Sequence, residues 1–414
     1  NIKVGIAELG VYKNPMETEK GTGVLLLSMI HKVAVRRRIQ KISLKVYKTN
    51  KKALHLYERC GYRVVKEDIN FLYMEKDMNQ RALIIAEMSA NHQHKLEIAL
   101  QTIKEAALAG ADAVKIQTYT PDSITIDCTN EYFQINKGTI WDGRTLYDLY
   151  KEAYTPWEWY DELKGTAEAL GLLFFSTPFD RSAVDFLHEK NTPMYKIASF
   201  EITDIPLIEY TASKGKPMII STGIAEFSEI QDSVDACRKV GNNNITLLKC
   251  TSSYPAPIER ANLRTMLDMK QTFRVDIGLS DHTLGKDVAI GAAALGAQMI
   301  EKHFIINRNL GGPDVSFSME PKEFEEMVVS IRNVEKALGS VCYKIPEEER
   351  KNRSFARSLF VVEDIKKNDC FSEWNIRSIR PGYGLAPKYY FKVIGKKARR
   401  DIKRGSPLLE EDII

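Results

Sequence analysis

Short apolar runs and amphipathic segments alternate along the central part of the chain, from about residue 81 to residue 339. Segments of helical periodicity are clearest at residues 96–108, 226–240 and 287–295. Between such segments stand eight runs typical of buried β-strands, at residues 83–88, 113–118, 172–176, 194–198, 217–222, 245–250, 275–280 and 298–303. Eight strands and eight helices in about 260 residues predict a closed (β/α)8 TIM barrel. A doubly wound open sheet is the alternative, but the glycine fingerprint of a dinucleotide-binding sheet is missing after the first strand.

Two pieces with different patterns flank the predicted barrel. Residues 1–77 alternate between strand-like and helix-like runs and predict a small α+β piece. Residues 346–356 are mostly charged and predict a linker, and residues 357–414 hold short β-runs separated by turn signals. The tail is therefore predicted to be a small β-rich domain, too small for an independent enzyme. The barrel domain is expected to span residues 81–345.

One insertion interrupts the barrel pattern, between Pro121 and Pro156. A loop this long inside a compact barrel is usually functional, so we expect a lid or an oligomer contact. Its tyrosines, Tyr147, Tyr150 and Tyr154, recur at helical spacing. This spacing favours packing over a surface on which a sugar stacks.

The composition is that of a globular protein with a large core, because 44% of the residues are hydrophobic and 28% are charged. No apolar run reaches the roughly 18 residues of a membrane-spanning helix, and no secretion signal is visible, so we expect no membrane partner. The six cysteines are scattered and form no CxxC pair, which favours the reducing cytoplasm and argues against a thiolate zinc site. The chain does not begin with Met, which leaves open that it is a piece of a longer protein.

The net charge of +4 conceals a split. Residues 1–77 carry sixteen basic against eight acidic side chains, whereas the remainder is mildly acidic. The basic run Arg36–Arg38 is expected to be a solvated helix face rather than a nucleic-acid site, because no aromatic surface or nucleic-acid motif accompanies it.

Polar or reactive residues follow every predicted barrel strand, at the carboxyl end where barrel enzymes carry their active sites. They include Glu87, Lys115, Gln117, Thr177, Lys196, Ser199, Glu201, Ser221, Tyr254, Ser280, His282 and His303. Capping of the next helix could explain any single one, but their presence at all eight strands predicts an active site at the barrel mouth.

The residue types indicate the chemistry of that mouth. Two lysines, Lys115 and Lys196, and several hydroxyls form an anion pocket suited to a phosphate and a carboxylate. His282 and His303, on neighbouring strands, could share one divalent metal and leave positions open for water and a substrate oxygen. His92, on a separate loop, and His188, in a barrel helix, are not expected to bind it.

The N-terminal piece resembles the second half of a GNAT-type N-acetyltransferase. The loop with Gly21 and Gly23 precedes an apolar helix start, and Asn50 and Tyr57 follow in an NxxAxxLY motif. The resemblance implies that the glycines hold the acetyl-CoA pyrophosphate and that Asn50 and Tyr57 lie near its thiol. Thr18 departs from the family pattern and the first half of the fold is missing, so we expect a fragment that is inactive alone.

Motifs in the rest of the chain resemble the sialic acid synthase family. They are Glu87 with Asn91-His92, Val114-Lys115-Ile116-Gln117, Phe175-Ser176-Thr177-Pro178-Phe179, Tyr195-Lys196-Ile197-Ala198-Ser199, Ser221-Thr222-Gly223, Gly278-Leu279-Ser280-Asp281-His282, Glu301-Lys302-His303 and Gly312-Pro313-Asp314. The tail, with Ile379-Arg380-Pro381-Gly382, resembles the family's C-terminal SAF, or antifreeze-like, domain (a β-clip). Within the family the insertion looks most like that of pseudaminic acid synthases, and Ser252 replaces an Asn of the neuraminate branch.

The resemblance implies a reaction in which phosphoenolpyruvate joins the open-chain aldehyde of an N-acetylated amino sugar. The expected sugar is 2,4-diacetamido-2,4,6-trideoxy-L-altrose, and the products are pseudaminic acid and phosphate. It also implies a divalent metal, Mn²⁺ first and Mg²⁺ or Co²⁺ as alternatives, and a domain-exchanged homodimer.

The family's functional positions carry over residue by residue. Glu87 is the expected acid/base or sugar anchor, Glu201 orients the attacking water, and His282 and His303 hold the metal. Phosphoenolpyruvate is expected to be bound by Lys115, Thr177, Lys196, Ser199, Ser221 and Ser280. The sugar is expected to be bound by Gln117, Tyr254, Asp314 and, from the partner subunit, an arginine equivalent to Arg380.

Three alternatives stay open at this point. The sugar could be that of a neuraminate or legionaminate synthase. The chain could instead be an acetyl-CoA-dependent acetyltransferase with an accessory barrel, against which the missing half-site argues. A non-catalytic carbohydrate-binding protein is the third, against which the full set of mouth residues argues.

Overall fold

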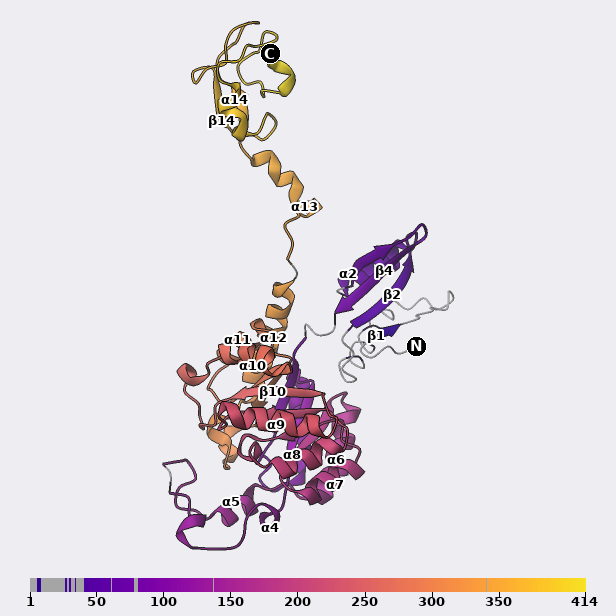
Figure 1. Cartoon of the computed structure of the whole chain (residues 1–414), viewed down its shortest axis with the longest axis vertical. Helices are drawn as coiled ribbons and strands as arrows, with labels where there is room; N and C mark the ends of the chain where they lie inside the picture. The colour runs from indigo at the N-terminus through magenta and orange to yellow at the C-terminus, as the bar shows by residue number, and fades with distance from the viewer. Residues whose placement is uncertain are drawn as a thin grey trace. The chain divides into compact units, whose positions relative to one another are not determined.

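The computed structural model describes residues 41–60, 62–77, 81–136, 138–339 and 341–414, together with residues 6–8, 27, 30 and 34. The chain divides into two compact units, Asn1–Gly339 and Ser340–Ile414. The first unit contains a closed barrel and a separate N-terminal sheet, and the second contains the C-terminal tail (Figure 1). The basic run at residues 36–38 lies outside the described residues.

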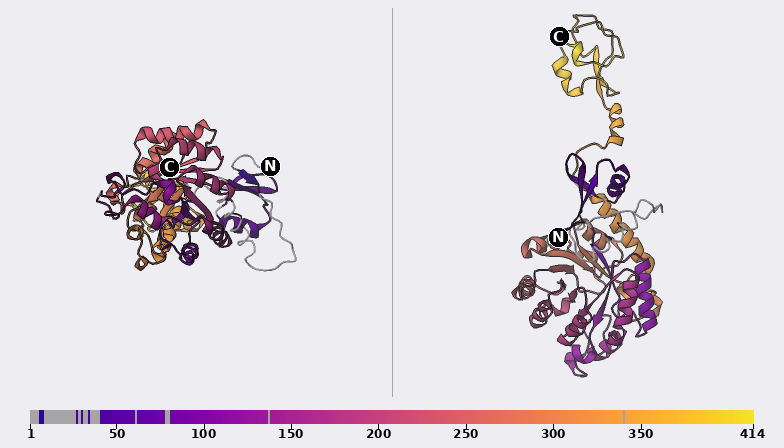
Figure 2. Two further views of the ribbon diagram at one scale, coloured as in Figure 1. Left: turned by 90° about the horizontal axis from the view of Figure 1, so that it is seen from below. Right: turned by 90° about the vertical axis from the view of Figure 1, so that its right-hand side faces the viewer.

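Eight parallel strands close into a barrel in the order β10-β11-β12-β5-β6-β7-β8-β9, which confirms the predicted fold and excludes an open sheet. The strands are β5 (Leu83–Glu87), β6 (Ala113–Thr118), β7 (Leu173–Pro178), β8 (Tyr195–Ile197), β9 (Met218–Ser221), β10 (Ile245–Cys250), β11 (Asp276–Asp281) and β12 (Met299–His303). The helices around them are α3 (Leu96–Leu108), α6 (Tyr160–Ala169), α7 (Arg181–Glu189), α8 (Ile205–Ser213), α9 (Phe227–Lys239), α10 (Arg264–Phe273), α11 (Asp287–Ala294) and α12 (Pro321–Leu338). Figure 2 shows this ring of helices from two further sides.

The inside of the barrel has an apolar and a polar level. Alternate residues of a strand point to opposite faces, so every second residue faces the barrel axis. Near the amino ends of the strands these inward positions form an apolar cluster of Leu83, Ile85, Ala113, Phe175, Met194, Ile219, Leu248 and Met299. Two residues further along the same strands the inward positions are polar, as at Glu87, Lys115, Thr177, Lys196, Ser221 and Glu301. The carboxyl ends of the strands therefore form a buried polar mouth above an apolar floor.

The insertion predicted between β6 and β7 is present and partly ordered into short elements. It contains α4 (Pro121–Ile124), a 3₁₀ turn at Glu131–Phe133 and α5 (Leu146–Ala153). An antiparallel bridge joins Gln134 to Thr145, so the intervening segment folds back on itself. Figure 1 shows α4 and α5 beyond one end of the barrel.

The N-terminal piece is a mixed sheet with strand order β1-β2-β4-β3. Its elements are β1 (Ile6–Glu8), β2 (Lys41–Tyr47), α2 (Lys51–Arg59), β3 (Arg63–Glu67) and β4 (Phe71–Asp77). A small core, which includes Leu44, Leu54 and Met74, joins α2 to the sheet. The predicted α+β character is confirmed for the described residues.

The second unit is small and β-rich, as predicted. Strands β13 (Ser358–Val361) and β14 (Ile376–Ile379) pair antiparallel, and isolated bridges such as Ile365 with Ile402 extend the pairing. The region expected to be a linker carries the short helix α13 (Glu347–Arg350) and a 3₁₀ turn, and α14 (Tyr390–Val393) lies near the end. None of the helices in the described part of the chain is both long and apolar enough to cross a bilayer.

A glycine in β11 makes the apolar floor possible. A Cβ at Gly278 would lie 2.5 Å from the Met299 carbonyl oxygen and 2.6 Å from Leu248 Cδ2. We expect Gly278→Ala to destabilise the barrel by about 1–3 kcal/mol, the usual effect of overpacking a core, as measured by denaturant unfolding.

Gly165→Ala is the matched control for this substitution. Gly165 lies in α6, and a Cβ there meets nothing within 4 Å. Alanine should therefore stabilise the helix by roughly 0.5–1 kcal/mol. Equal effects of the two substitutions would contradict the tight packing at Gly278.

Candidate active site

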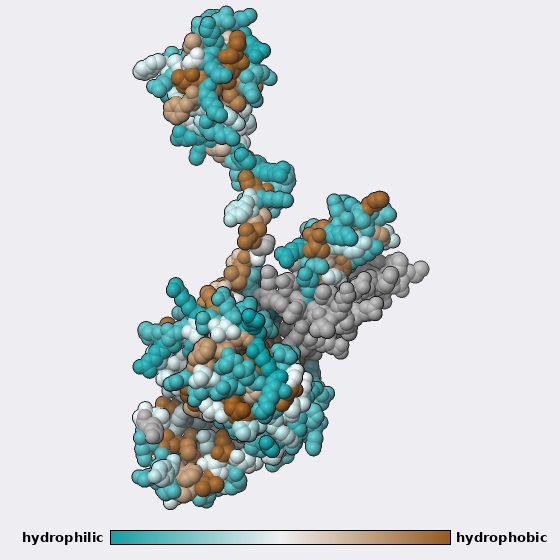
Figure 3. Space-filling model, in the orientation of Figure 1, coloured by the Kyte–Doolittle hydropathy of each residue, from teal (hydrophilic) through white to brown (hydrophobic). Residues whose placement is uncertain are grey.

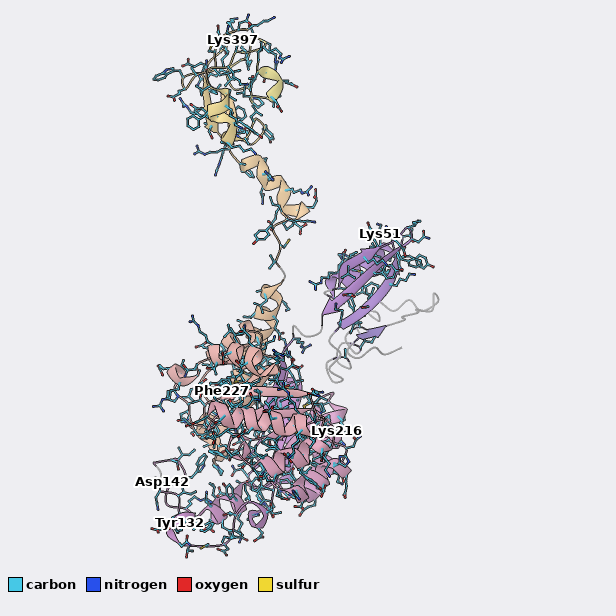
Figure 4. The ribbon with its side chains drawn as sticks, in the orientation of Figure 1. Lys51, Tyr132, Asp142, Lys216, Phe227 and Lys397 are labelled. Carbon is cyan, nitrogen blue, oxygen red and sulfur yellow. The ribbon has the colours of Figure 1, made fainter. Side chains whose placement is uncertain are left out.

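A cavity of about 380 Å³ lies at the carboxyl ends of the barrel strands. All thirteen barrel residues predicted from the sequence line it: Glu87, Lys115, Gln117, Thr177, Lys196, Ser199, Glu201, Ser221, Tyr254, Ser280, His282, His303 and Asp314. They come from seven of the strands and from the loops after them, because parallel strands in a barrel all end at the same rim. Figure 4 shows the side chains of the first unit as sticks, with Tyr132 and Asp142 of the insertion labelled.

Four charged side chains meet inside the barrel, and each is at most 5% exposed. Lys115 Nζ lies 2.6 Å from Glu87 Oε2 and 3.8 Å from Glu301 Oε2. Lys196 Nζ lies 3.7 Å from Glu301 Oε1. Lys115 also donates a hydrogen bond to Thr177 Oγ1 at 3.1 Å. Because buried charges are costly unless they are paired, these two carboxylates and two ammonium groups stabilise one another.

The two carboxyl groups of this cluster differ in their affinity for a proton. Burial raises the pKa of Glu87 to about 7, although Lys115 opposes the effect. Burial acts on Glu301 in the same direction, but Lys115 and Lys196 outweigh it and hold the pKa of Glu301 below its usual value. Ser280 supports the ionised form by donating to Glu301 Oε1 at 3.1 Å. Glu87 can therefore exchange a proton near neutral pH, whereas Glu301 stays ionised.

The two histidines predicted as metal ligands lie side by side at the ends of β11 and β12. Their ring centroids are 5.3 Å apart. The Nδ1 atom of His282 donates a hydrogen bond to the Thr251 carbonyl oxygen at 3.1 Å, so Nε2 is the nitrogen that has a lone pair when the ring is neutral. Burial lowers the pKa of His282, but Cys250 and the Thr251 carbonyl outweigh it and raise the pKa above its usual value, so a metal ion at Nε2 would displace a proton. Next to the histidines in sequence, Lys302 donates a buried hydrogen bond of 2.7 Å to Asp281 and so joins the same two strands.

The histidine pair has the features of a site for one divalent cation. Burial and the neighbouring His282 hold the pKa of His303 well below its usual value, so its imidazole is neutral, as metal binding requires. The Nδ1 atom of His303 is buried without a hydrogen-bond partner among the described residues and lies 3.8 Å from Asp314 Oδ2. No cluster of three or more His, Cys, Asp or Glu side chains suited to a metal occurs in the described ranges. An ion here would therefore have two protein nitrogens and several open positions.

The residues predicted to bind a sugar lie around the histidines and Glu87. Gln117 Nε2 donates to Ser89 Oγ at 2.9 Å and to Glu87 Oε1 at 3.4 Å. Asp314 Oδ2 accepts a weak hydrogen bond from the Ala90 amide at 3.4 Å, and burial raises the pKa of Asp314. The Tyr254 ring lies 4.4 Å from the His282 ring.

Two further predicted residues present unpaired oxygens to the cavity. The Oε2 atom of Glu201 and the Oγ atom of Ser221 are buried without a partner in the described part of the molecule. Burial raises the pKa of Glu201 to about 7. Buried polar atoms without partners in an otherwise satisfied site indicate places for a ligand or water.

Some predicted residues do not join the cavity. Arg380 is exposed on the second unit. Asn50 caps α2 by accepting a hydrogen bond from the Ala53 amide at 3.1 Å, and Tyr57 packs edge-on against Tyr62. Gly21 and Gly23 lie outside the described residues.

The two histidines that were not expected to bind metal lie apart from the cavity. His92 is fully buried and hydrogen-bonds Thr155 Oγ1 at 3.1 Å, and His188 is exposed in α7. Neither lines the cavity.

Several residues that line the cavity were given no role from the sequence. The strand-end pattern contains Glu301 and Cys250, and burial of Cys250 would raise its pKa, but His282 at 3.7 Å lowers it to about 7. Ser89 lies two residues beyond the end of β5. The insertion adds Ile124, Ile135, Thr139, Trp141, Leu146, Leu149, Tyr150 and Ala153, and the barrel adds Ala90, Tyr119, Phe179, Ala198, Phe200, Pro313 and Phe317. The tyrosines of the insertion were expected to pack, and Tyr150 does so against Tyr119, although it also faces the cavity.

Comparison with protein families gives three matches along the chain. Residues 102–343 match the NeuB family, residues 356–414 match the SAF domain, and residues 4–62 match the acetyltransferase (GNAT) family. The three matches follow the order of the three resemblances read from the motifs.

Individual relatives extend this similarity over most of the chain. The chain is 48% identical over 337 residues to a pseudaminic acid synthase of Helicobacter pylori. This alignment covers 81% of this chain and 99% of that protein. A pseudaminic acid synthase of Campylobacter jejuni is 46% identical, with coverage of 81% and 97%, and an N,N'-diacetyllegionaminic acid synthase of that species is 36% identical, with coverage of 80% and 100%. Among solved structures, an N-acetylneuraminic acid synthetase of Leptospira borgpetersenii in complex with citrate has a TM-score of 0.58 at 33% identity, covering 70% of this chain and 95% of that one.

The raised pKa of Glu201 predicts a pH-dependent stability. The folded state keeps a proton up to about pH 7, whereas an unfolded glutamate loses it near pH 4.3. The folded state binds more protons between these values, so stability declines as the pH rises through this window. We expect Glu201→Gln, which cannot ionise, to be more stable than the parent at pH 8 by roughly 1–3 kcal/mol, and the difference to shrink toward pH 4.5.

Thermal unfolding at a series of pH values measures this effect. Glu189→Gln, at the exposed end of α7, serves as the control and should change nothing at any pH. A Glu201→Gln protein that is equally or less stable than the parent at pH 8 would refute the assignment.

Proposed function

The chain belongs to the NeuB family, and from this membership and the geometry of the cavity we propose that it condenses phosphoenolpyruvate with an N-acetylated amino sugar. The sugar reacts as its open-chain aldehyde, and the products are a nine-carbon 2-keto acid and phosphate. The observation that carries the proposal is that two buried lysines and a pair of adjacent buried histidines line the same cavity.

The sugar we propose is 2,4-diacetamido-2,4,6-trideoxy-L-altrose, and the product is pseudaminic acid. Identity is higher to the pseudaminic acid synthases, at 46–48%, than to the diacetyllegionaminic acid synthase, at 36%. The similarity spans almost the whole length of these relatives, so the barrel and the SAF domain are both included.

The cavity residues suit the binding of phosphoenolpyruvate at the polar level of the barrel. Lys115 and Lys196 offer ammonium groups to its phosphate and carboxylate, and Thr177, Ser199, Ser221 and Ser280 offer hydroxyls. The free Oγ of Ser221 has no competing partner among the described residues. Binding beneath the histidines holds carbon 3 of phosphoenolpyruvate close to the place of the sugar aldehyde.

His282 and His303 would hold the divalent metal on which sialic acid synthases depend, with Mn²⁺ as our proposal and Mg²⁺ or Co²⁺ as alternatives. When bound, such an ion supplies a Lewis acid that draws electron density from a carbonyl oxygen and makes its carbon more electrophilic. The two imidazoles fit this role because both are buried, His303 has an unpartnered Nδ1 among the described residues, and His282 directs Nδ1 to a carbonyl oxygen and leaves Nε2 for the ion once its proton is lost.

The proton transfers fall to the two glutamates whose pKa lies near 7. Protonated Glu87 gives the proton of Oε1, the oxygen that Lys115 does not hold, to the sugar oxygen as the bond between carbon 3 and the aldehyde carbon forms. Glu201 Oε2 accepts a proton from the water that adds to carbon 2. The tetrahedral centre then loses phosphate by cleavage of the bond between carbon 2 and oxygen, and Lys196 stabilises the departing anion.

We further propose that the active unit is a homodimer in which the SAF domain of one subunit covers the barrel mouth of the other. Exposed apolar side chains stand on four successive loops after β8, β9, β10 and β11, namely Phe200, Ile224, Phe227, Ile258 and Leu284, which are 48–61% exposed. The SAF domain carries exposed Trp374, Tyr383 and Phe391, and Arg380 is exposed on the same domain. Two apolar surfaces of this kind suit mutual burial, and Arg380 would then reach the partner's sugar.

The acetyltransferase-like piece receives no activity of its own in this proposal. The GNAT match covers residues 4–62, and the resemblance extends only to the second half of an acetyl-CoA site. Acetyl-CoA would be bound only if the missing half were supplied. All six cysteines are free thiols, which fits our inference of a cytoplasmic location.

The direct test is phosphate release from phosphoenolpyruvate with each candidate sugar. We expect turnover with 2,4-diacetamido-2,4,6-trideoxy-L-altrose and at least tenfold lower kcat/KM with N-acetylmannosamine or with the D-mannose isomer that leads to legionaminic acid. A preference for either of the latter would correct the sugar, and sugar binding without phosphate release would refute the synthase.

The same reaction reports on the metal. Chelation should abolish phosphate release, and Mn²⁺ should restore it. His282→Ala and His303→Ala should lose metal-dependent turnover but still bind phosphoenolpyruvate, because the lysines remain. His188→Ala, on an outer helix, is the control and should stay active. Full activity of metal-free protein would exclude the metal.

Subunit mixing tests the dimer. Arg380→Ala and Glu87→Ala should each be inactive, since one lacks the reaching arginine and the other a barrel carboxyl. Random exchange puts one working site into half of the dimers, so an equal mixture should recover up to about a quarter of the parent activity. A lack of recovery after light scattering has shown subunit exchange would contradict the arrangement.

A further inference from the structure

The cavity has a polar and an apolar part, and the apolar part is shared between the insertion and barrel residues such as Phe179, Phe200 and Phe317. The strand ends supply charges and hydroxyls, whereas the insertion supplies Ile135, Trp141, Leu146, Leu149 and Ala153. Ile135, Leu149 and Ala153 are at most 9% exposed. In Figure 3, apolar surface gathers where the insertion meets the barrel. A substrate in this cavity therefore meets polar partners on one side and hydrocarbon on the other.

We propose that Trp141, at the tip of the insertion, is the specificity-determining residue of this apolar wall and recognises the methyl-bearing substituents of the sugar. This inference rests on the proposed function. The substituents in question are the acetamido groups and the 6-methyl group of a 6-deoxy sugar. An indole face excludes water from such groups and offers no hydrogen bond to a hydroxyl in their place.

Contacts on the barrel side fix the position of Trp141. Its Nε1 donates a hydrogen bond to the Pro313 carbonyl oxygen at 3.1 Å, next to Asp314. Its ring lies 5.5 Å from the Tyr254 ring, which in turn lies against His282. The tip of the insertion thus contacts the loops after β10 and β12 that carry two proposed sugar-binding residues.

Contacts within the insertion hold the tip in shape without a ligand. The Ile135 amide donates to the Arg144 carbonyl oxygen, and the Gly143 amide donates to the Ile135 carbonyl oxygen, both at 2.9 Å. Asp142, labelled in Figure 4, accepts from the amides of Gly138 at 2.8 Å and Thr139 at 2.9 Å. The indole is therefore presented by a preformed turn, and little ordering is needed when a sugar binds.

The base of the insertion is fixed to the barrel by a second group of contacts. Thr155 hydrogen-bonds the buried His92, and the Tyr154 ring lies 4.8 Å from the His94 ring. Trp157 Nε1 donates to the Tyr119 carbonyl oxygen at 3.1 Å, and Tyr119 packs against Tyr150. Because both the base and the tip are fixed, the wall between them keeps a defined distance from the strand ends.

This arrangement predicts that the enzyme discriminates between a 6-deoxy sugar and its 6-hydroxy analogue, which the polar side of the cavity cannot do. A 6-hydroxyl group pressed against the indole face of Trp141 would lose its water and gain no partner from that ring, whereas a 6-methyl group would be buried favourably. A hydrophobic wall of this kind separates substrates that differ by one such group by tenfold to a hundredfold. Phosphoenolpyruvate, which binds at the strand ends, should be unaffected.

The experiment compares two sugars that differ by one oxygen atom. They are 2,4-diacetamido-2,4,6-trideoxy-L-altrose and its 6-hydroxy analogue, 2,4-diacetamido-2,4-dideoxy-L-altrose, assayed by phosphate release with the full chain and Mn²⁺. The parent should prefer the 6-deoxy sugar at least tenfold in kcat/KM. Trp141→Ala should reduce this preference about tenfold with an unchanged KM for phosphoenolpyruvate. Trp141→Phe, which keeps an apolar ring, should retain part of the preference.

Tyr132→Ala is the matched control, because Tyr132 is an aromatic residue of the same insertion, is 80% exposed and does not line the cavity. It should leave both sugars and their ratio unchanged. An equal loss of kcat/KM for both sugars in Trp141→Ala and Trp141→Phe would assign the residue a merely structural role and overturn the inference. A parent enzyme that uses both sugars equally would also overturn it while sustaining the proposed function. Phosphate release with neither sugar and with no other N-acetylated sugar would instead refute the proposed function itself.

Discussion

The attraction between two buried carboxylates and two buried ammonium groups is the interaction on which the site depends. Glu87, Lys115, Lys196 and Glu301 lie at inward positions of four strands, one level above the apolar floor. Each would be strongly unfavourable alone in a barrel interior, and together they form a neutral set. The strands must therefore keep their register, because a shift by one residue would turn these charges toward the helices. The strand register that the fold requires is therefore the same register that places these charges in the mouth.

The neutral set also explains how one barrel can contain an acid and an anion side by side. Glu301 has both lysines as neighbours and a hydrogen bond from Ser280, so its charge is compensated. Glu87 has one lysine and a longer contact from Gln117, so burial prevails and its carboxyl binds a proton near neutral pH. The two groups are chemically identical, and only their neighbours separate their roles. An anionic substrate entering the mouth competes with both glutamates for the same lysines, which couples substrate binding to the proton on Glu87.

The barrel and most of its mouth could be predicted from the sequence because both follow from periodicity. Buried parallel strands give apolar runs, and the residue after each run must lie at the common rim, so residues as distant as Lys115 and His303 could be placed together. Glu301 and Cys250 fit the same alternation, two residues after the inward Met299 and Leu248, but the pattern alone assigns neither of them a role. The apolar wall could not be predicted, because the insertion has no strand periodicity and its contacts, such as Trp141 with Pro313, join residues 172 apart in the chain. The tyrosine spacing correctly indicated packing but did not reveal that Tyr150 also faces the cavity.

The insertion leaves and rejoins the barrel between two consecutive strands, β6 and β7, and its internal turn is held mainly by its own backbone. Its share of the cavity lining is thus encoded in one continuous stretch of sequence, whereas the strand ends that form the polar part are dispersed over the whole barrel. Recombination or small insertions and deletions in that stretch can reshape this part of the lining while the dispersed strand ends stay intact.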